Sequence, residues 1–181
     1  RHGGFSDLRH ERRVLEWLDG RFKAPRVLGY EETSTHAYLL ATEIAGKPAS
    51  DALSAECSTA ISETHLARKL AREMGRLHDL PIDGCDLDQR LNVKFETARR
   101  NIELRLLSQT DEEFASEHGG KLPIDVLKNL TERAPVEDDL VFTHGDPCMP
   151  NLLTDGGEVT GFVDLGGAGV ADRYTDIAIF F

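Results

Sequence analysis

The stretch THGDPCMPNLLTDGGEVTGFVDLGG, residues 143–167, sets Asp146, Asn151 and Asp164 among short apolar runs and glycine-rich turns. Short apolar runs separated by glycines predict small strands joined by tight loops. Glycine also permits the sharp backbone turns that bring such a loop and a following aspartate together. We therefore expect a group of small strands that holds three oxygen-bearing side chains in one loop region.

The chemistry that suits these three side chains is metal-assisted phosphoryl transfer. Such a reaction needs an oriented hydroxyl and a divalent cation that bridges the phosphates of the donor. Asp146 is suited to accept the proton of the hydroxyl, and Asn151 and Asp164 offer the oxygen ligands that Mg²⁺ prefers. Taken singly, an HGD tripeptide is more often an ordinary turn, and DxG is common in loops. The prediction therefore depends on the joint pattern.

The remainder of the chain is expected to open as helix, strand, strand and to continue mainly with helices. The first twenty residues have a helical rhythm of apolar side chains that ends at a C-terminal glycine, Gly20. Strands are expected at residues 26–31 and 37–43, and helices near residues 93–107 and 123–134. The final DRYTDIAIFF predicts the start of another helix. A longer amphipathic helix is expected from Ser62 until Pro81 closes it, with one apolar face formed by Leu66, Leu70, Met74 and Leu77.

The chain is strongly acidic. Its 21 Lys and Arg residues against 32 Asp and Glu residues give a net charge of −11. A surface of this sign repels a nucleic-acid backbone and attracts a polycationic ligand. Many soluble proteins are simply acidic, and composition alone also fits that plainer interpretation. We expect no nucleic-acid partner.

Neither a membrane span nor a disulfide framework is predicted. No apolar run approaches the roughly 20 residues that a transmembrane helix needs, and no charged-then-apolar leader opens the chain. The three cysteines, Cys57, Cys85 and Cys148, are far apart and form no CxxC pair, so neither a disulfide nor a zinc site is indicated. We expect a cytoplasmic protein with reduced thiols and no membrane partner.

The segment HGDPCMPN resembles the catalytic loop of the aminoglycoside 3'-phosphotransferases, whose pattern is HGDxxxxN followed by a metal-binding Asp-x-Gly. The segment GFVDLGGAGVADRYTDIA is similar to the corresponding segment of that family over its whole length. The resemblance implies that Asp146 is the catalytic base, that Asn151 and Asp164 are the magnesium ligands, and that Asp176 braces the catalytic loop. From the residues alone, Asp176 is equally a first-turn acid favoured by the helix dipole.

Two neighbours of Asp146 are expected to be structural. His144 is expected to pack and to position the backbone, because no partner for metal ligation lies at zinc-like spacing. Cys148 is expected to be a small filler rather than a reactive thiol, because nothing nearby in the sequence would lower the pKa of the thiol.

The resemblance extends upstream. The segment DLRHERRVLEWLDGRFKAPRVLGY resembles the amino-lobe helix of the family and the strand after it, which implies that Glu11 pairs with a phosphate-binding lysine. Alone, the same letters indicate a solvated helix face with alternating charges. The run LLATEIAGKP resembles the hinge between the lobes, which implies that the backbone of Thr42, Glu43 and Ile44 touches the base of ATP or GTP.

The resemblance implies an α+β, protein-kinase-like bilobal fold, here mostly the helical carboxy-terminal lobe. Residues 1–43 are expected to be a partial amino-terminal lobe, and residues 44–181 a carboxy-terminal catalytic lobe that is truncated at its end. A Gly-rich phosphate loop and its lysine are missing, since Lys23 and Lys47 lie in the wrong places. Both ends look cut, and Gly167 stands where many relatives have an arginine.

The acidic stretch TDEEFASEHGG, residues 110–120, lies where the family has a loop that contacts the aminoglycoside. Carboxylates suit that role because protonated amines need charge-assisted partners. A solvated helix start explains the same letters, and both interpretations stay open. The candidate substrate-binding residues are Asp111, Glu112, Glu113 and Glu117.

The expected function is the transfer of the γ-phosphate of ATP or GTP, with Mg²⁺, to a hydroxyl of an aminoglycoside antibiotic, which confers resistance. One rival is a kinase of the same fold that acts on another amino sugar or a choline-like amine. A second rival is a non-catalytic binding remnant, suggested by the missing lysine and phosphate loop. The oligomeric state is left open.

Overall fold

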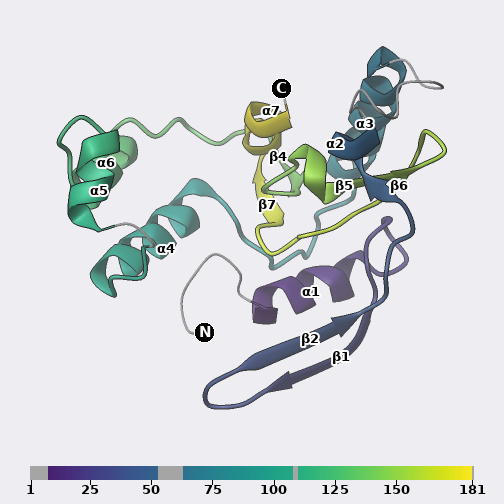
Figure 1. The fold of residues 1–181 in the computed structure, drawn as a ribbon, viewed down its shortest axis with the longest axis horizontal. Helices are drawn as coiled ribbons and strands as arrows, with labels where there is room; N and C mark the ends of the chain where they lie inside the picture. Colours follow the sequence, from purple (N-terminus) through teal and green to yellow (C-terminus); the bar gives the residue numbers. More distant parts are fainter. Residues whose placement is uncertain (1–7, 53–62, 108–109, 181) are drawn as a thin grey trace.

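The computed structural model describes residues 8–52, 63–107 and 110–180. Its first helix, α1 (Leu8–Leu18), packs against an antiparallel hairpin of β1 (Val27–Glu32) and β2 (Ala37–Ala41), as Figure 1 shows. The expected helix is confirmed, and Gly20 beyond its end has a φ of +72°, a left-handed conformation that glycine tolerates. The two expected strands are also confirmed, although the second ends at Ala41 rather than at residue 43.

Two short elements, β3 (Lys47–Pro48) and α2 (Ala49–Ala52), lead toward the long helix α3 (Glu63–His78). Ser62, the predicted start of this helix, lies outside the described residues. The predicted apolar face of α3 is confirmed because Leu66, Leu70, Met74 and Leu77 are all buried. This face packs toward β4 and β6, beneath the segment that carries the candidate site.

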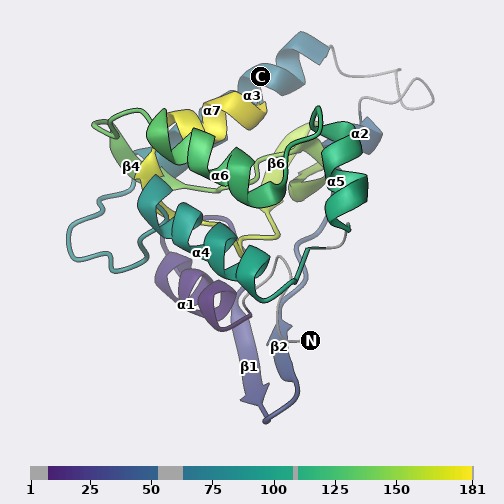
Figure 2. The same cartoon turned by 90° about the vertical axis from the view of Figure 1, so that its left-hand side faces the viewer.

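Three further helices, α4 (Leu91–Glu103), α5 (Asp111–Glu117) and α6 (Pro123–Glu132), lie together on one side of the molecule (Figures 1 and 2). The predicted end of the first at residue 107 is wrong. Arg105 takes a φ of +53°, and the amide of Leu106 donates to the carbonyl oxygen of Asn101 at 2.8 Å. This left-handed ending stops the helix at Glu103 without the glycine that usually marks it.

Small strands make up the candidate site region, as predicted. The strand β4 (Leu140–Thr143) pairs with β7 (Gly169–Asp172), while β5 (Leu152–Asp155) pairs with both β3 and β6 (Glu158–Phe162). A single 3₁₀ turn, η2 (Met149–Asn151), precedes β5. The expected final helix is α7 (Tyr174–Phe180).

One hydrophobic core joins the amino-terminal helix to the small strands. Trp17 of α1 stacks on Phe142 of β4 with ring centroids 4.3 Å apart, and Leu18 is buried beside residues of α3. Within the described ranges, no helix is long and apolar enough to cross a membrane. Because α1 packs directly on the catalytic segment, Glu11 on its surface is held in a defined position relative to the site.

Candidate active site

The loop that carries Asp146 leaves β4 at Thr143 and turns sharply at Gly145, whose φ is +86°. A Cβ atom on Gly145 would lie 2.2 Å from the carbonyl oxygen of Gly167, so no other residue fits there without backbone movement. This contact brings the loop against the segment that follows Asp164. Asp146 itself is exposed, which leaves its carboxylate accessible to a substrate.

The carboxylate of Asp176 binds the backbone of this loop through two hydrogen bonds. Its Oδ2 accepts a hydrogen bond from the amide of His144 and its Oδ1 accepts one from the amide of Gly145, both at 2.8 Å. The side chain is fully buried, in the first turn of α7. The interpretation of Asp176 as a brace of the loop is therefore confirmed. Asp176 is also a first-turn acid of α7, so the two interpretations of this residue agree.

Asn151 and Asp164 meet at one end of the β5–β6 hairpin. The amide of Val163 donates to the carbonyl oxygen of Asn151 at 2.9 Å, and Asp164 is the next residue along the chain. The Asn151 Nδ2 donates to the backbone oxygen of Asp146, also at 2.9 Å. The side-chain nitrogen of Asn151 is therefore committed to the loop, and its side-chain oxygen is the atom suited to a cation.

Asp164 has an unusual backbone, with a φ of +57°. A non-glycine residue in this region is uncommon, and such conformations concentrate at functional sites. The side chain is exposed. One carboxylate and one amide oxygen match Mg²⁺, which usually binds one or two protein groups and fills its shell with water and phosphate oxygens. The residues present thus fit the predicted cation.

Glu11 faces this region from α1. Burial raises the pKa of the Glu11 carboxyl, and the negative charge of Asp164 raises it further. A Cβ atom on Gly166 would lie 4.0 Å from Glu11 Oε2, which places the carboxylate beside the Asp164 loop. Two neighbouring carboxylates repel one another, so a cation between them would be favourable. The structure thus favours a role for Glu11 at the site over a merely solvated helix face.

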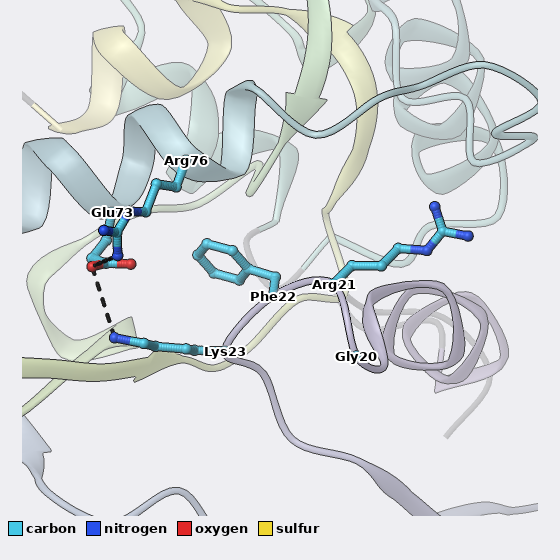
Figure 3. A pocket seen from close by; sticks show the side chains of 6 residues that line it. All are labelled: Gly20, Arg21, Phe22, Lys23, Glu73 and Arg76. Atoms are coloured by element: carbon cyan, nitrogen blue, oxygen red, sulfur yellow. Dashed lines mark hydrogen bonds and ion pairs between the residues drawn. The ribbon is translucent and has the colours of Figure 1, made fainter.

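Lys23 does not serve as the cation for Glu11. Its Nζ donates to the backbone oxygen of Val159 at 3.0 Å and lies 3.7 Å from the carboxylate of Glu73 in α3. Figure 3 shows Lys23 turned toward Glu73, which also pairs with Arg76 at 2.7 Å. These side chains line a shallow hollow of about 380 Å³. The prediction that Lys23 is not the phosphate-binding lysine agrees with this geometry.

The predicted hinge follows β2. The amide of Thr42 donates to the carbonyl oxygen of Arg26, and the Thr42 hydroxyl accepts from the Arg26 amide, both at 2.9 Å. The backbone N–H of Thr42 is therefore already engaged. The side chain of Ile44 lies against Gly161 of β6, where a Cβ atom would come 3.0 Å from it. A donor to a nucleotide base would have to come from Glu43 or Ile44.

The acidic stretch forms α5, which begins with a capping box. The Glu113 amide donates to the Thr110 hydroxyl at 3.2 Å, and the Thr110 amide donates to the Glu113 carboxylate at 2.8 Å. The hydrogen bonds that the Thr110 amide and the Thr110 hydroxyl donate to the carboxylate lower the pKa of Glu113. Glu113 is thus committed to the helix start. All four acidic residues, Asp111, Glu112, Glu113 and Glu117, are exposed on the surface of this helix. The helix-start interpretation is confirmed, and contact with a substrate stays a prediction.

The whole chain, residues 1–181, matches the model of the phosphotransferase enzyme family. The chain belongs to this family. An aminoglycoside 3'-phosphotransferase of Niallia circulans is 38% identical over 173 residues, which are 95% of this chain and 63% of that protein. One from Escherichia coli is 33% identical over 175 residues, which are 97% of this chain and 63% of that protein. The chain therefore spans somewhat less than two thirds of the length of these relatives.

Solved structures give the same assignment of fold. An aminoglycoside 3'-phosphotransferase of type VIII matches with a TM-score of 0.75 and 30% identity, over 95% of this chain and 62% of that chain. An aminoglycoside phosphotransferase from Streptomyces rimosus, solved with ADP and streptomycin, matches with a TM-score of 0.71 and 29% identity, over 95% of this chain and 64% of that chain. The predicted α+β, protein-kinase-like fold is confirmed as that of the aminoglycoside phosphotransferases.

Some contacts in this structure were not found from the sequence. His78 lies at the end of the helix that was predicted to close at Pro81, and no role was predicted for it, yet its side chain is buried and its Nε2 lies 2.8 Å from Oδ2 of Asp176. A histidine directly after Leu77, next to the buried face of the helix, indicated a buried polar group. The sequence did not indicate which residue would be its partner. The capping box was readable, since Thr110 and Glu113 have the spacing that defines it. Cys148 lies beside Asp146, and burial together with this charge raises the pKa of its thiol, which agrees with an unreactive filler.

His144 should make the stability of the protein depend on pH. The ring is fully buried, and burial lowers its pKa below the ordinary value of 6.5. As the pH falls below 6.5, the unfolded chain takes up a proton that the folded ring resists, so stability present above that pH is lost. We expect the temperature at the midpoint of unfolding to be lower at pH 5.5 than at pH 7.5.

The matched variant is His144→Asn, because the ring Nδ1 accepts from the Asp146 amide at 3.3 Å and an amide oxygen can replace it. Thermal unfolding of both proteins across this pH range is the measurement. The variant should lose less stability than the parent on acidification. If both proteins lost the same stability on acidification, burial of His144 would not contribute to the pH dependence.

Proposed function

We propose that the full-length protein transfers the γ-phosphate of ATP or GTP to a hydroxyl of an aminoglycoside antibiotic and so confers resistance. The observation that supports this most is the arrangement of one loop. Asp176 holds the loop backbone, Asn151 donates to Asp146, and Asp164 follows the residue that pairs with Asn151. A base and two oxygen ligands are thus gathered at one end of the β5–β6 hairpin.

Each of these residues has a distinct task in the proposed reaction. Asp146 accepts the hydroxyl proton of the substrate and holds the oxygen in line with the phosphate. Asn151 and Asp164 would hold Mg²⁺, which would supply positive charge at the phosphates. Glu11, which lies on α1, pairs with a phosphate-binding lysine and orients it at the phosphates. Glu43 and Ile44 offer backbone groups to the nucleotide base.

We propose that residues 1–43 belong to the nucleotide-binding lobe and residues 44–181 to the catalytic lobe. The change at this boundary from a hairpin that packs on α1 to the group of small strands supports the division. We also propose a cytoplasmic location, where a nucleoside triphosphate donor is available.

A cationic antibiotic fits the acidic character of the chain, whose net charge is −11. Such a surface raises the local concentration of polycations. The Streptomyces rimosus relative was solved with streptomycin, which supports an aminoglycoside as the substrate class. A kinase for another amino sugar or a choline-like amine shares the same catalytic loop, and a binding remnant shares the same fold, so an assay must separate the three.

The test is a coupled assay of ADP or GDP release by the full-length protein with Mg²⁺, using kanamycin, streptomycin, an amino sugar and choline as acceptors. Release that depends on an aminoglycoside supports the proposal. Release that depends only on choline or a simple amino sugar identifies the first rival. Nucleotide binding without release on any acceptor identifies the remnant.

Glu112 should contribute to aminoglycoside affinity. Its carboxylate is exposed in the first turn of α5, whereas that of Glu113 is engaged by Thr110. Glu112→Gln is therefore expected to raise KM for kanamycin by about 2- to 10-fold, because an exposed charge-assisted contact is modest in strength. Because such a contact is equally strong in the ground and transition states, kcat should not change.

Glu113→Gln is the matched control, because glutamine also completes a capping box. We expect it to leave KM for kanamycin near the parent value. Steady-state kinetics at two salt concentrations measure both variants, since screening weakens only charges that remain. If both variants keep the parent KM and salt dependence, α5 is only a solvated helix.

A further inference from the structure

A buried histidine supports the brace of the catalytic loop. His78, in the last turn of α3, has a side chain that is 4% exposed, and its Nε2 lies 2.8 Å from Oδ2 of the fully buried Asp176. The two residues are 98 positions apart in the sequence. Neither belongs to the groups that would touch the substrate, the nucleotide or the metal.

We propose that His78 is a positioning residue for phosphoryl transfer: through Asp176 it sets the orientation of the backbone that presents Asp146. The inference rests on the proposed function. Its basis is that three N–H groups converge on one carboxylate. His78 Nε2 and the His144 amide donate to Oδ2, and the Gly145 amide donates to Oδ1.

The geometry assigns the proton of the histidine ring. A carboxylate that receives two backbone N–H groups acts as an acceptor, so the ring nitrogen 2.8 Å away must be the donor. His78 therefore carries its proton on Nε2. The other two donors belong to the loop itself and move with it. His78 is the donor that ties the carboxylate to a separate, rigid element.

That element is well anchored. Leu66, Leu70 and Leu77 of α3 are each at most 1% exposed and belong to the central core. With His78 in place, rotation of the Asp176 carboxylate would break a buried hydrogen bond and leave a buried polar group without its partner. Without His78, the same rotation would cost less, and the two loop amides would follow it.

Small movements of these amides would also displace the groups that take part in the reaction. Gly145 lies against Gly167, so the loop cannot shift without moving the segment after Asp164. Asn151 Nδ2 donates to the backbone oxygen of Asp146 and would move with it. A misplacement of about 1 Å can lower turnover by about 10²-fold when geometry controls the reaction. The effect of His78 should therefore fall on kcat rather than on nucleotide binding.

The experiment compares His78→Met, which fills the site without a donor, with His78→Gln, whose Nε2 can donate in place of the ring nitrogen. Leu70→Ala is the control for destabilisation of α3, because Leu70 is buried in the same helix away from Asp176. For each full-length variant we would measure the unfolding midpoint, kcat, KM for the nucleotide and the hydrogen-exchange rates of the His144 and Gly145 amides.

We expect His78→Met to lower kcat by about 10- to 100-fold, as the loss of an orienting hydrogen bond typically does. KM for the nucleotide should stay within about twofold, because the loss is in the transition state. Exchange at the His144 and Gly145 amides should become faster. His78→Gln should restore most of kcat and of the protection, and Leu70→Ala should lower the midpoint while leaving kcat of the folded protein unchanged.

Several outcomes would overturn the inference. A folded His78→Met variant with the parent kcat would do so, as would a folded His78→Gln variant that restores nothing. If His78→Met does not fold, the tautomer of His78 in the unmodified protein, read by ¹⁵N NMR, decides together with His78→Gln. A proton found on Nδ1 contradicts the donation to Asp176. If the unmodified protein transfers no phosphate, the proposed function fails, and the exchange and tautomer results still test the positioning of the loop.

Discussion

Asp146→Asn is expected to lower the turnover of the full-length protein by about 10²- to 10⁴-fold, the usual contribution of general-base catalysis, while folding and nucleotide binding persist. The amide keeps the shape of the side chain but cannot take a proton. The loop should keep its position, since Asn151 Nδ2 donates to the backbone oxygen of Asp146 at 2.9 Å, and its longer contact of 3.4 Å with Asp146 Oδ2 can also be made with an amide oxygen. Steady-state phosphorylation of kanamycin and the unfolding midpoint are the measurements.

Asp155→Asn makes the same chemical change at an exposed position at the far end of β5. This control should retain the parent turnover. Unchanged turnover in Asp146→Asn would remove Asp146 from the role of base. A loss smaller than about tenfold would mean that orientation of the hydroxyl matters more than proton removal, as a loose transition state permits.

Asp164→Ala is expected to abolish Mg²⁺-dependent nucleotide binding, and Asn151→Ala to weaken it less. A carboxylate brings a full charge to the cation, whereas an amide oxygen brings only a dipole. Asp164 also lies beside the half-buried Glu11, whose pKa is raised by burial and by the Asp164 charge. Removal of Asp164 should therefore lower the pKa of Glu11 toward its ordinary value.

Titration of Mg²⁺ against nucleotide binding gives a midpoint for each protein, with Asp155→Ala as the matched control. Equal midpoints for Asp164→Ala and Asn151→Ala would contradict the ranking. Asn151→Ala should show a second effect, a lower kcat at saturating Mg²⁺, because Asn151 also holds the backbone of Asp146. If that variant kept the full kcat, the role of Asn151 would be limited to binding the metal.

The ends of the helices show where sequence patterns lose their power. The buried face of α3 follows from apolar residues at helical spacing, because burial itself selects that spacing. The start of α4 depends on Glu137, whose carboxylate accepts from the Leu91 amide at 2.9 Å across 46 residues. Its end depends on the left-handed Arg105. Neither feature has a local sequence signal, so the expected limits of 93 and 107 were both displaced.

The candidate site divides in the same way. Its candidate catalytic loop could be predicted from sequence because Asp146 and Asn151 lie in one short segment whose pattern, HGDxxxxN, resembles that of a known family. Thr42 was expected to offer its backbone to a nucleotide, but its N–H donates to the carbonyl oxygen of Arg26, the residue just before β1. Strand pairing, which spacing does not specify, decided how that group is used.

By itself, the sequence determined which residue types stand near Asp146, where the turns fall and which faces of the helices are apolar, since each depends on neighbours along the chain. Only the tertiary structure decided that His78, His144 and Gly145 meet on the buried carboxylate of Asp176. A buried charge is stable only where enough donors converge on it. Here those donors come from α3 and from the loop after β4, and the packing of the core, rather than any local pattern, brings them within 2.8 Å.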